Sequence, residues 1–309
     1  MLKHCYKCNK QHSTGRKQMY PTITAIAAYA AQQLEECRLW TVHSVYKKTV
    51  NLQAGERLLA LQAASSPMSP ISIITDMDVR AFEVLPVKPG QQVSIAGSRI
   101  IISSPEHTVS FGCLPKKVCC TRLTCPPGPF PCKELLSQIR QAVASSQAGI
   151  FRLLFCDSTE GQAITGKEEY SLILAAARSR ILQCSECLEQ HLYGDAAKHL
   201  AGLIGLGIGL TPSGDDFLCG VLAGLILRGE ESHPFAHALC QEITSRRFDT
   251  NDISRAFLDC SVQHHFSLAV NSLTDLPSAD RILNVFSAIG HSSGIDTLCG
   301  VAYGLSAEV

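Results

Sequence analysis

The sequence predicts an α+β fold with a β-rich N-terminal half and a mostly helical C-terminal half that carries a duplicated helix-start motif. Three observations lead to this prediction. Short β-branched runs separated by Gly, Pro and Ser fill residues 39–112, and longer segments with helical patterning fill the second half. Two similar stretches lie eighty residues apart in that second half. Strands followed by helices favour α+β over a parallel sheet wound with alternating helices.

The composition along the chain predicts four segments. Residues 1–38 read as a polar extension followed by an Ala-rich helix over 20–38 with a proline near its start. Residues 39–112 read as a β-rich subdomain. Residues 113–132 hold five prolines and five cysteines, and so much proline favours a connector over a helix or central strand. Residues 133–309 read as a helical subdomain that carries the candidate site.

Local patterns predict the individual elements of both halves. The stretch "SIAGSRIII" in the β-rich subdomain predicts a hairpin, because a Gly-Ser turn separates two β-branched runs. Helical patterning in the second half predicts helices over residues 133–147, 167–191, 194–204, 215–228, 234–246, 252–270, 278–289 and 294–306.

Composition narrows the class of partner and the location. The 309 residues are 46% hydrophobic, with 27 basic and 27 acidic side chains, so the formal net charge is zero. A nucleic-acid partner is not expected, because such proteins carry a basic surplus or patch. No membrane segment is expected, because no run of about 18 apolar residues is uninterrupted. Fifteen cysteines and no secretory signal predict reduced thiols in the cytoplasm.

An internal repeat is the most specific feature of the second half. Residues 213–225, "SGDDFLCGVLAGL", and residues 293–305, "SGIDTLCGVAYGL", are identical at nine of thirteen positions. Each copy has two glycines four residues apart on one helical face, where another helix can approach closely. The repeat predicts two similar helices, packed glycine face to glycine face or against a shared neighbour. If the two helix starts lie together, Asp216 and Asp296 converge on one pocket.

A structural alternative explains part of each copy. Ser-x-x-Asp before an apolar run is a variant of the capping box, in which Ser213 and Asp216 satisfy helix-start amides. Capping does not explain the residues before the first copy, which are Gly205, Gly207 and Gly209 followed by Thr211. Repeated glycine allows positive φ and lets backbone amides face a ligand. Free amides beside aspartates favour a ligand that has an anionic end and an N–H donor end, or an anion bridged by a metal ion.

The two motifs "GLGIGLTPSGDDFLCGVL" and "GHSSGIDTLCG" carry a resemblance to a known family. They resemble a bacterial domain family of largely uncharacterised proteins that includes a subunit of the oxamate carbamoyltransferase of anaerobic allantoin degradation. The resemblance covers residues 42–305 and includes Thr250, Ser254 and Leu258. It implies a multi-subunit enzyme of purine nitrogen catabolism that converts oxalurate and phosphate into oxamate and carbamoyl phosphate. The implied ligand is a small anionic amide, and the implied partners are other carbamoyltransferase subunits.

The resemblance also implies the roles of the motif residues. Asp216, Asp296 and His291 are the candidate catalytic residues: the aspartates accept from N–H groups or hold Mg²⁺, and His291 acts as general acid or base. Mg²⁺ is the one candidate cofactor. The candidate substrate-binding residues are Gly207, Gly209, Thr211, Ser213, Asp215, Ser293 and Thr297. Two positions depart from the family pattern, with Ile208 in place of Pro and His264 in place of Gly.

Two other functions remain open at this point. The chain can be a non-catalytic assembly subunit that binds the same metabolite, or a stand-alone metal-dependent hydrolase or carboxylase. A structural zinc site is a further alternative, since Cys5-x-x-Cys8 and Cys184-x-x-Cys187 would supply four ligands if they met in space.

Overall fold

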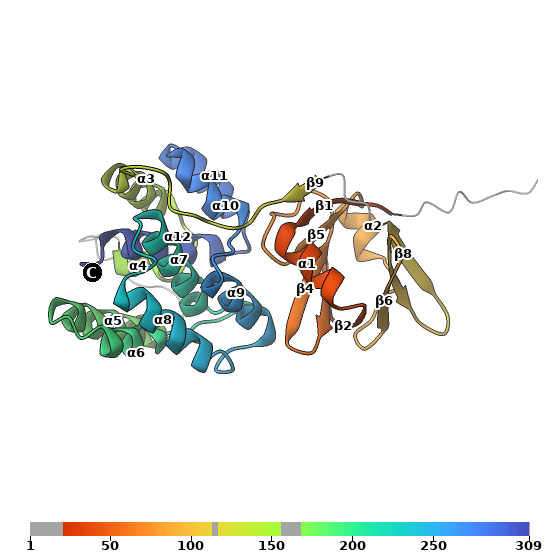
Figure 1. Cartoon of the computed structure of the whole chain (residues 1–309), viewed down its shortest axis with the longest axis horizontal. Helices are drawn as coiled ribbons and strands as arrows, with labels where there is room; N and C mark the ends of the chain where they lie inside the picture. The colour runs from red at the N-terminus through yellow and green to blue at the C-terminus, as the bar shows by residue number, and fades with distance from the viewer. Residues whose placement is uncertain (1–20, 113–116, 156–167, 309) are drawn as a thin grey trace, which may run out of the picture.

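A computed structural model describes residues 21–112, 117–155 and 168–308, which form a β-rich part and a helical part (Figure 1). The sheet and two helices make up the first part, and the remaining helices make up the second. Each part has its own cluster of buried apolar residues. The predicted α+β class is therefore confirmed.

Nine strands of the described residues form one sheet in the order β8-β7-β6-β2-β3-β4-β5-β1-β9. The sheet is curled, and a bridge between Thr22 and Gly112 joins the start of β1 to the end of β8. The predicted hairpin is confirmed as the antiparallel pair β6 and β7. The strands are β1 Ile23–Ala27, β2 Leu39–Tyr46, β3 Thr49–Ala54, β4 Arg57–Gln62, β5 Ser72–Thr75, β6 Gln92–Ala96, β7 Arg99–Ser103, β8 Thr108–Gly112 and β9 Lys117–Cys119.

The helix expected over residues 20–38 begins only at Ala28, because residues 23–27 form strand β1. Strand β1 pairs antiparallel with β5 and parallel with β9. Those partners lie far along the chain, and the pairing overrides the helical preference of the alanines. Strands β1 and β9 lie within the ranges 1–38 and 113–132, so the sheet draws in residues from both; the division into four segments stays a prediction.

The helices of the second half lie close to their predicted positions, except at the break between α9 and α10. The helices are α1 Ala28–Glu36, α2 Val79–Glu83, α3 Cys132–Ser145, α4 Arg152–Phe155, α5 Glu168–Glu189, α6 Tyr193–Ala201, α7 Ser213–Leu227, α8 Pro234–Ser245, α9 Asp252–Val262, α10 Leu268–Asn271, α11 Ala279–Ser287 and α12 Ser293–Ser306. The described part of the chain contains no helix with the length and apolar character that a membrane crossing requires.

The single helix predicted over residues 252–270 is wrong, because the chain breaks between α9 and α10. His264 has a φ of 65° in this break, in the left-handed region that favours glycine. That conformation cannot continue an α-helix. It also gives a physical reason for the glycine that the family pattern has at this position.

Helix α9 connects the two parts of the molecule. Ala256 and Cys260 belong to the buried cluster of the sheet, whereas Leu258 belongs to the buried cluster of the helices. Figure 1 shows α9 between the sheet and helices α7 and α12. Helix α9 therefore lies between the sheet and the region where α7 and α12 begin.

Candidate functional site

Helices α7 and α12 lie side by side with their glycines facing each other. A Cβ atom at Gly220 would come within 2.9 Å of Gly300 Cα, and one at Gly224 within 2.9 Å of Gly304 Cα. Neither position has room for a side chain, since real Cβ atoms do not approach so closely. Because the facing pairs advance together along both helices, the helices run parallel and begin at the same end. The predicted packing of glycine face against glycine face is confirmed.

The capping boxes predicted at the two helix starts are wrong. Helix α7 begins at Ser213 behind Pro212, and α12 begins at Ser293 behind Ser292, and neither start has a side-chain cap. The physical reason is that the carbonyl of Pro212 accepts from the amide of Asp216 at 3.2 Å, so each helix extends one residue further back than expected. The motif serines and aspartates are therefore free for other contacts.

Backbone carbonyls from the preceding loops take over part of the capping. The amide of Gly214 donates to the carbonyl of Leu206 at 2.8 Å, and the amide of Gly294 donates to the carbonyl of Ile289 at 3.2 Å. These bonds satisfy one early amide of each helix. They also leave fewer free helix-start amides for an anion than the sequence predicts.

The first carboxyl group, that of Asp216, meets hydroxyl groups from both helix starts. Thr211 Oγ1 donates to Asp216 Oδ2 at 2.9 Å, and it lies 2.7 Å from Ser293 Oγ. The hydroxyl of Ser293 also contacts the Asp216 carboxyl group, so the two hydroxyl groups and the carboxyl group form one cluster. Asp216 and both hydroxyl residues keep part of their surface exposed. This cluster joins residues 82 positions apart, and its carboxyl group is largely withdrawn from solvent.

The second carboxyl group, that of Asp296, is fully buried. Its Oδ1 accepts from the amide of Phe151 at 2.9 Å. Gly149 has a φ of 84° and lies against the same carboxyl, so the segment before Phe151 crosses the start of α12. The hydroxyl groups of Ser213 and Ser292 also lie against this carboxyl group and favour its charged form, so Asp296 meets the serine of the other copy of the repeat. The Phe151 contact was missed from sequence, because nothing in the pattern connects it with Asp296.

The two carboxyl groups perturb each other. Burial raises the pKa of Asp216 well above its usual range, the hydroxyls of Ser293 and Thr211 oppose this, and the charge of Asp296 raises the pKa further. Burial raises the pKa of Asp296 to about 6, against the effect of the Phe151 amide and neighbouring donors. Buried carboxyl groups with raised pKa values are suited to acid–base chemistry.

The neighbouring Asp215 has a different environment. Its Oδ1 accepts from the amide of Gly205 at 2.8 Å, and its Oδ2 accepts from Thr250 Oγ1 at 2.5 Å and from Ser254 Oγ at 2.6 Å. The residue is 1% exposed. Burial raises its pKa, and the three hydrogen bonds oppose this shift. Thr250 and Ser254 belong to the family resemblance, and their hydroxyls contact this carboxyl group.

The glycine-rich loop before α7 has the backbone conformation that its composition predicts. Gly205, Gly207 and Gly209 all have positive φ, at 75°, 137° and 116°. A Cβ at Gly207 would overlap the backbone at Ser213, so the loop packs directly on the start of α7. Gly209 has open space around it, and its neighbour Ile208 is 41% exposed. The loop is thus anchored at its base and open at its tip.

The remaining candidate residues lie at the second helix start. His291 is exposed and makes no hydrogen bond to the described residues. Thr297 donates through Oγ1 to the carbonyl of Ser293 at 2.8 Å, one turn back in α12. Its own carbonyl lies against Gly220. His291 is accessible to a ligand, whereas Thr297 contributes mainly to α12 and to its contact with α7.

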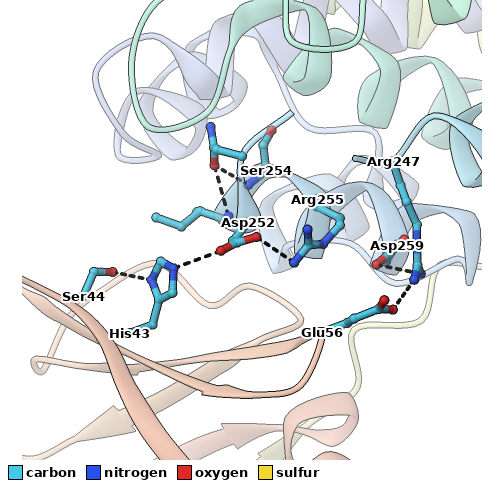
Figure 2. Close-up of polar contacts among 10 residues, drawn as sticks. His43, Ser44, Glu56, Arg247, Asp252, Ser254, Arg255 and Asp259 are labelled. Carbon is cyan, nitrogen blue, oxygen red and sulfur yellow. Dashed lines mark hydrogen bonds and ion pairs between the residues drawn. The ribbon is translucent and has the colours of Figure 1, made fainter. Parts of the chain in front are cut away.

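Sequence reasoning also missed a polar contact between α9 and the sheet, which Figure 2 shows. His43 of β2 lies with Nε2 3.2 Å from Asp252 Oδ2 and with Nδ1 3.0 Å from Ser44 Oγ. Asp252 also pairs with Arg255 at 2.7 Å. The start of α9, which holds Asp215, is thereby tied to the β-rich part. No local pattern in the sequence indicates this contact.

The described residues contain no group of three or more His, Cys, Asp or Glu side chains placed to hold a metal ion. An Mg²⁺ ion at Asp216 and Asp296 would need further oxygens from substrate or water, because this cation takes six oxygen ligands. Cys5 and Cys8 of the zinc alternative lie outside the described residues. None of the eleven cysteines that the structure describes is in a disulfide.

Comparison with known proteins places these features in a family. Residues 203–305 match the family model described as oxamate carbamoyltransferase subunit AllH, and residues 22–115 match the AllH family N-terminal domain. The first match contains both helix starts, and the two matches together cover more than half of the chain. No solved structure matches the chain. The chain belongs to the AllH family, whose name describes a subunit of the multi-subunit enzyme oxamate carbamoyltransferase.

Proposed function

We propose that the paired starts of α7 and α12 form the substrate site of an oxamate carbamoyltransferase in allantoin catabolism. The observation that carries the proposal is the partly exposed cluster of Thr211, Asp216 and Ser293, which joins the two copies of the repeat. The substrate class is a small anionic amide such as oxalurate or oxamate. Other subunits complete the enzyme, and the cytoplasmic location expected from the cysteine content belongs to the same proposal.

The chemistry of this cluster matches both ends of such a ligand. When a ligand binds, a hydroxyl of Thr211 or Ser293 that turns away from Asp216 can donate to an anionic oxygen, as can the free amides at the tip of the glycine loop. An ionised Asp216 accepts from an amide N–H, and a protonated Asp216 donates to an oxygen or nitrogen. A ligand with a carboxylate beside an amide needs both kinds of partner.

The contacts of Asp216 at the paired helix starts and its raised pKa support a role in the transfer step. A phosphate oxygen of the co-substrate attacks the carbamoyl carbon of oxalurate, and the bond from that carbon to the oxamate nitrogen breaks. The departing nitrogen needs a proton, and the protonated carboxyl of Asp216 supplies it. In the reverse direction the same carboxylate removes that proton. His291, exposed beside the second helix start, is the other candidate acid or base.

Turnover of the reconstituted complex tests the proposal. Asp216→Asn keeps the shape of the side chain but removes the acid, so we expect turnover to fall about 100-fold or more while the complex still assembles. Asp280→Asn is the matched control, because Asp280 is an exposed aspartate in the first turn of α11. Unchanged turnover in Asp216→Asn contradicts the catalytic role.

The same preparation separates the two other functions. A non-catalytic assembly subunit predicts that Asp216→Asn weakens binding of oxamate and leaves turnover at saturating substrate unchanged. A stand-alone metal-dependent hydrolase or carboxylase predicts activity of the purified single chain with a divalent metal and without partner subunits. We expect neither result.

A further inference from the structure

Asp215 and Asp216 are adjacent in α7 but face different neighbours. Successive residues of an α-helix point about 100° apart, so the two side chains leave the helix in different directions. Asp216 meets Thr211 and Ser293 at the paired helix starts. Asp215 meets the loop base and the start of α9 instead. The two aspartates of the motif therefore have separate surroundings.

The carboxyl group of Asp215 has its hydrogen-bonding capacity taken up by the protein. One oxygen accepts from the backbone amide of Gly205, and the other accepts from the hydroxyls of Thr250 and Ser254. The residue is 1% exposed. A substrate would have to displace these donors to reach it, at a cost of about 1–3 kcal/mol for each buried donor left without a partner.

These contacts hold one end of the glycine loop, and α9 holds the other. Asn251, the N-cap of α9, donates through Nδ2 to the carbonyl of Leu210 at 3.0 Å. Asp215 binds the loop at Gly205 and binds α9 at Ser254. The loop is thus closed against the first turn of α9 at both ends. That turn is itself tied to the sheet by Asp252 and His43 (Figure 2).

We propose that Asp215 is a positioning residue that fixes the glycine loop of residues 205–211 to the first turn of α9. In this role Asp215 does not touch the substrate, which differs from the substrate contact that the motif predicts. The inference rests on the proposed function for its effect on catalysis, since it places Thr211 and the loop amides beside Asp216. Its effect on the loop itself does not depend on any activity.

Replacement by asparagine or by alanine distinguishes positioning from substrate contact. In Asp215→Asn, Oδ1 still accepts from Gly205, and Nδ2 donates to Thr250 and Ser254, whose hydroxyls can reverse to accept. We therefore expect Asp215→Asn to keep turnover of the complex within about threefold, because its hydrogen bonds survive. Asp215→Ala loses all three bonds, and a misplaced loop is expected to cost about 100-fold in kcat.

Hydrogen exchange of residues 205–211 is the second readout, and it reports on the loop alone. We expect faster exchange in Asp215→Ala and wild-type exchange in Asp215→Asn, with Asp280→Asn as the control. Equal loss of turnover in both Asp215 variants, with unchanged loop exchange, overturns the inference because the negative charge itself is then required. Faster loop exchange in Asp215→Ala with full turnover supports positioning and contradicts the proposed function.

A second variant covers the case in which Asp215→Ala does not fold. Thr250→Val combined with Ser254→Ala keeps the Gly205 bond and removes both hydroxyl donors on the α9 side. Faster exchange of the loop and a lower kcat with an intact helical signal support the inference. Wild-type loop exchange and turnover in this double variant overturn it.

Discussion

Helices α7 and α12 are similar and pack against each other, yet the carboxyl groups at their starts have different environments. Asp216 at the start of α7 is partly exposed and bonded to a hydroxyl that links both helices. Asp296 at the start of α12 is fully buried and bonded to a backbone amide. Further along the two helices, Gly220 faces Gly300 and Gly224 faces Gly304, so the glycine contacts of the two copies are equivalent. Each carboxyl group meets the serine of the other copy, but Thr211 contacts only Asp216 and the Phe151 amide contacts only Asp296. The repeat therefore duplicates the helix pair and only part of the site.

The length of the preceding loop accounts for this difference. The carbonyl that blocks a side chain at Gly214 belongs to Leu203, eleven residues earlier, whereas the one at Gly294 belongs to Phe286, eight residues earlier. The first loop is thus three residues longer. Its extra length carries Thr211 across to the second helix start. We infer that the first copy supplies Thr211 and Asp216 to the site, and that the second copy supplies Ser293 and supports the site through the buried Asp296.

The largest effect is expected where the glycine faces of α7 and α12 contact each other. In Gly300→Ala, the new Cβ would overlap the carbonyl of Phe217 in the neighbouring helix, and a backbone group cannot move aside cheaply. We expect a loss of about 3 kcal/mol or more, which is a fall of about 5 °C in Tm for a chain of this length. Thermal unfolding followed by circular dichroism measures it.

Gly194→Ala is the control for this substitution. Gly194 lies in α6 with nothing near its would-be Cβ. Alanine there is expected to raise stability by about 0.5–1 kcal/mol, because it favours the helix over the unfolded chain. Similar unfolding temperatures for the two variants would contradict the close packing of α7 and α12.

A smaller effect is expected from truncating each carboxyl group. Asp296→Ala leaves the buried amide of Phe151 without a partner, which costs about 1–3 kcal/mol. Asp216→Ala leaves Thr211 and Ser293 bonded to each other near solvent, so its cost is expected to be lower. Urea unfolding of both variants measures the difference, and a larger loss in Asp216→Ala contradicts the supporting role of the second copy.

The pH dependence of stability also separates the buried carboxyl from an ordinary one. Asp296 has a pKa raised from 3.8 to about 6, so its contribution is fully present below pH 4 and is lost as the pH rises through 6. Asp296→Asn stays neutral and does not suffer this loss. We expect its urea midpoint to rise relative to wild type between pH 4 and pH 7. A constant difference over this range would show that the pKa is not raised.

The smallest effect is expected at the contact between α9 and the sheet. The side chains of His43 and Asp252 are 25% and 38% exposed, and pairs of that kind contribute about 1 kcal/mol or less. His43→Gln is therefore expected to change the free energy of unfolding by less than about 1 kcal/mol. Lys198→Ala, which breaks an exposed pair within α6, is the reference variant in the same urea measurement. A loss of several kcal/mol in His43→Gln would mean that this contact dominates the docking of the two parts.

Local sequence patterns were sufficient for much of the fold. The helix pair and its glycine contacts follow from spacing along a single helix, and the β6–β7 hairpin follows from a turn between two β-branched runs. Strand β1 was read as helix because its partners β5 and β9 lie about 50 and 90 residues away. Non-local pairing of this kind leaves no local signal.

The same limit applies to the candidate site. The motif singles out Thr211, Asp216 and Ser293, and these three side chains do lie together. It predicts substrate contact for Asp215, whose bonds to Gly205, Thr250 and Ser254 depend on where α9 packs and leave no local signal. The contact of Asp296 with Phe151 spans 145 residues, so it too could not be read from the sequence.

Hydrogen exchange of the assembled complex, with and without oxamate and carbamoyl phosphate, tests the central claim most directly. If the paired helix starts bind substrate, ligand slows exchange in residues 205–216 and in residues 289–297 together, and Asp216→Asn weakens this protection. Protection confined to the β-rich part or to other subunits would contradict a substrate site at the starts of α7 and α12.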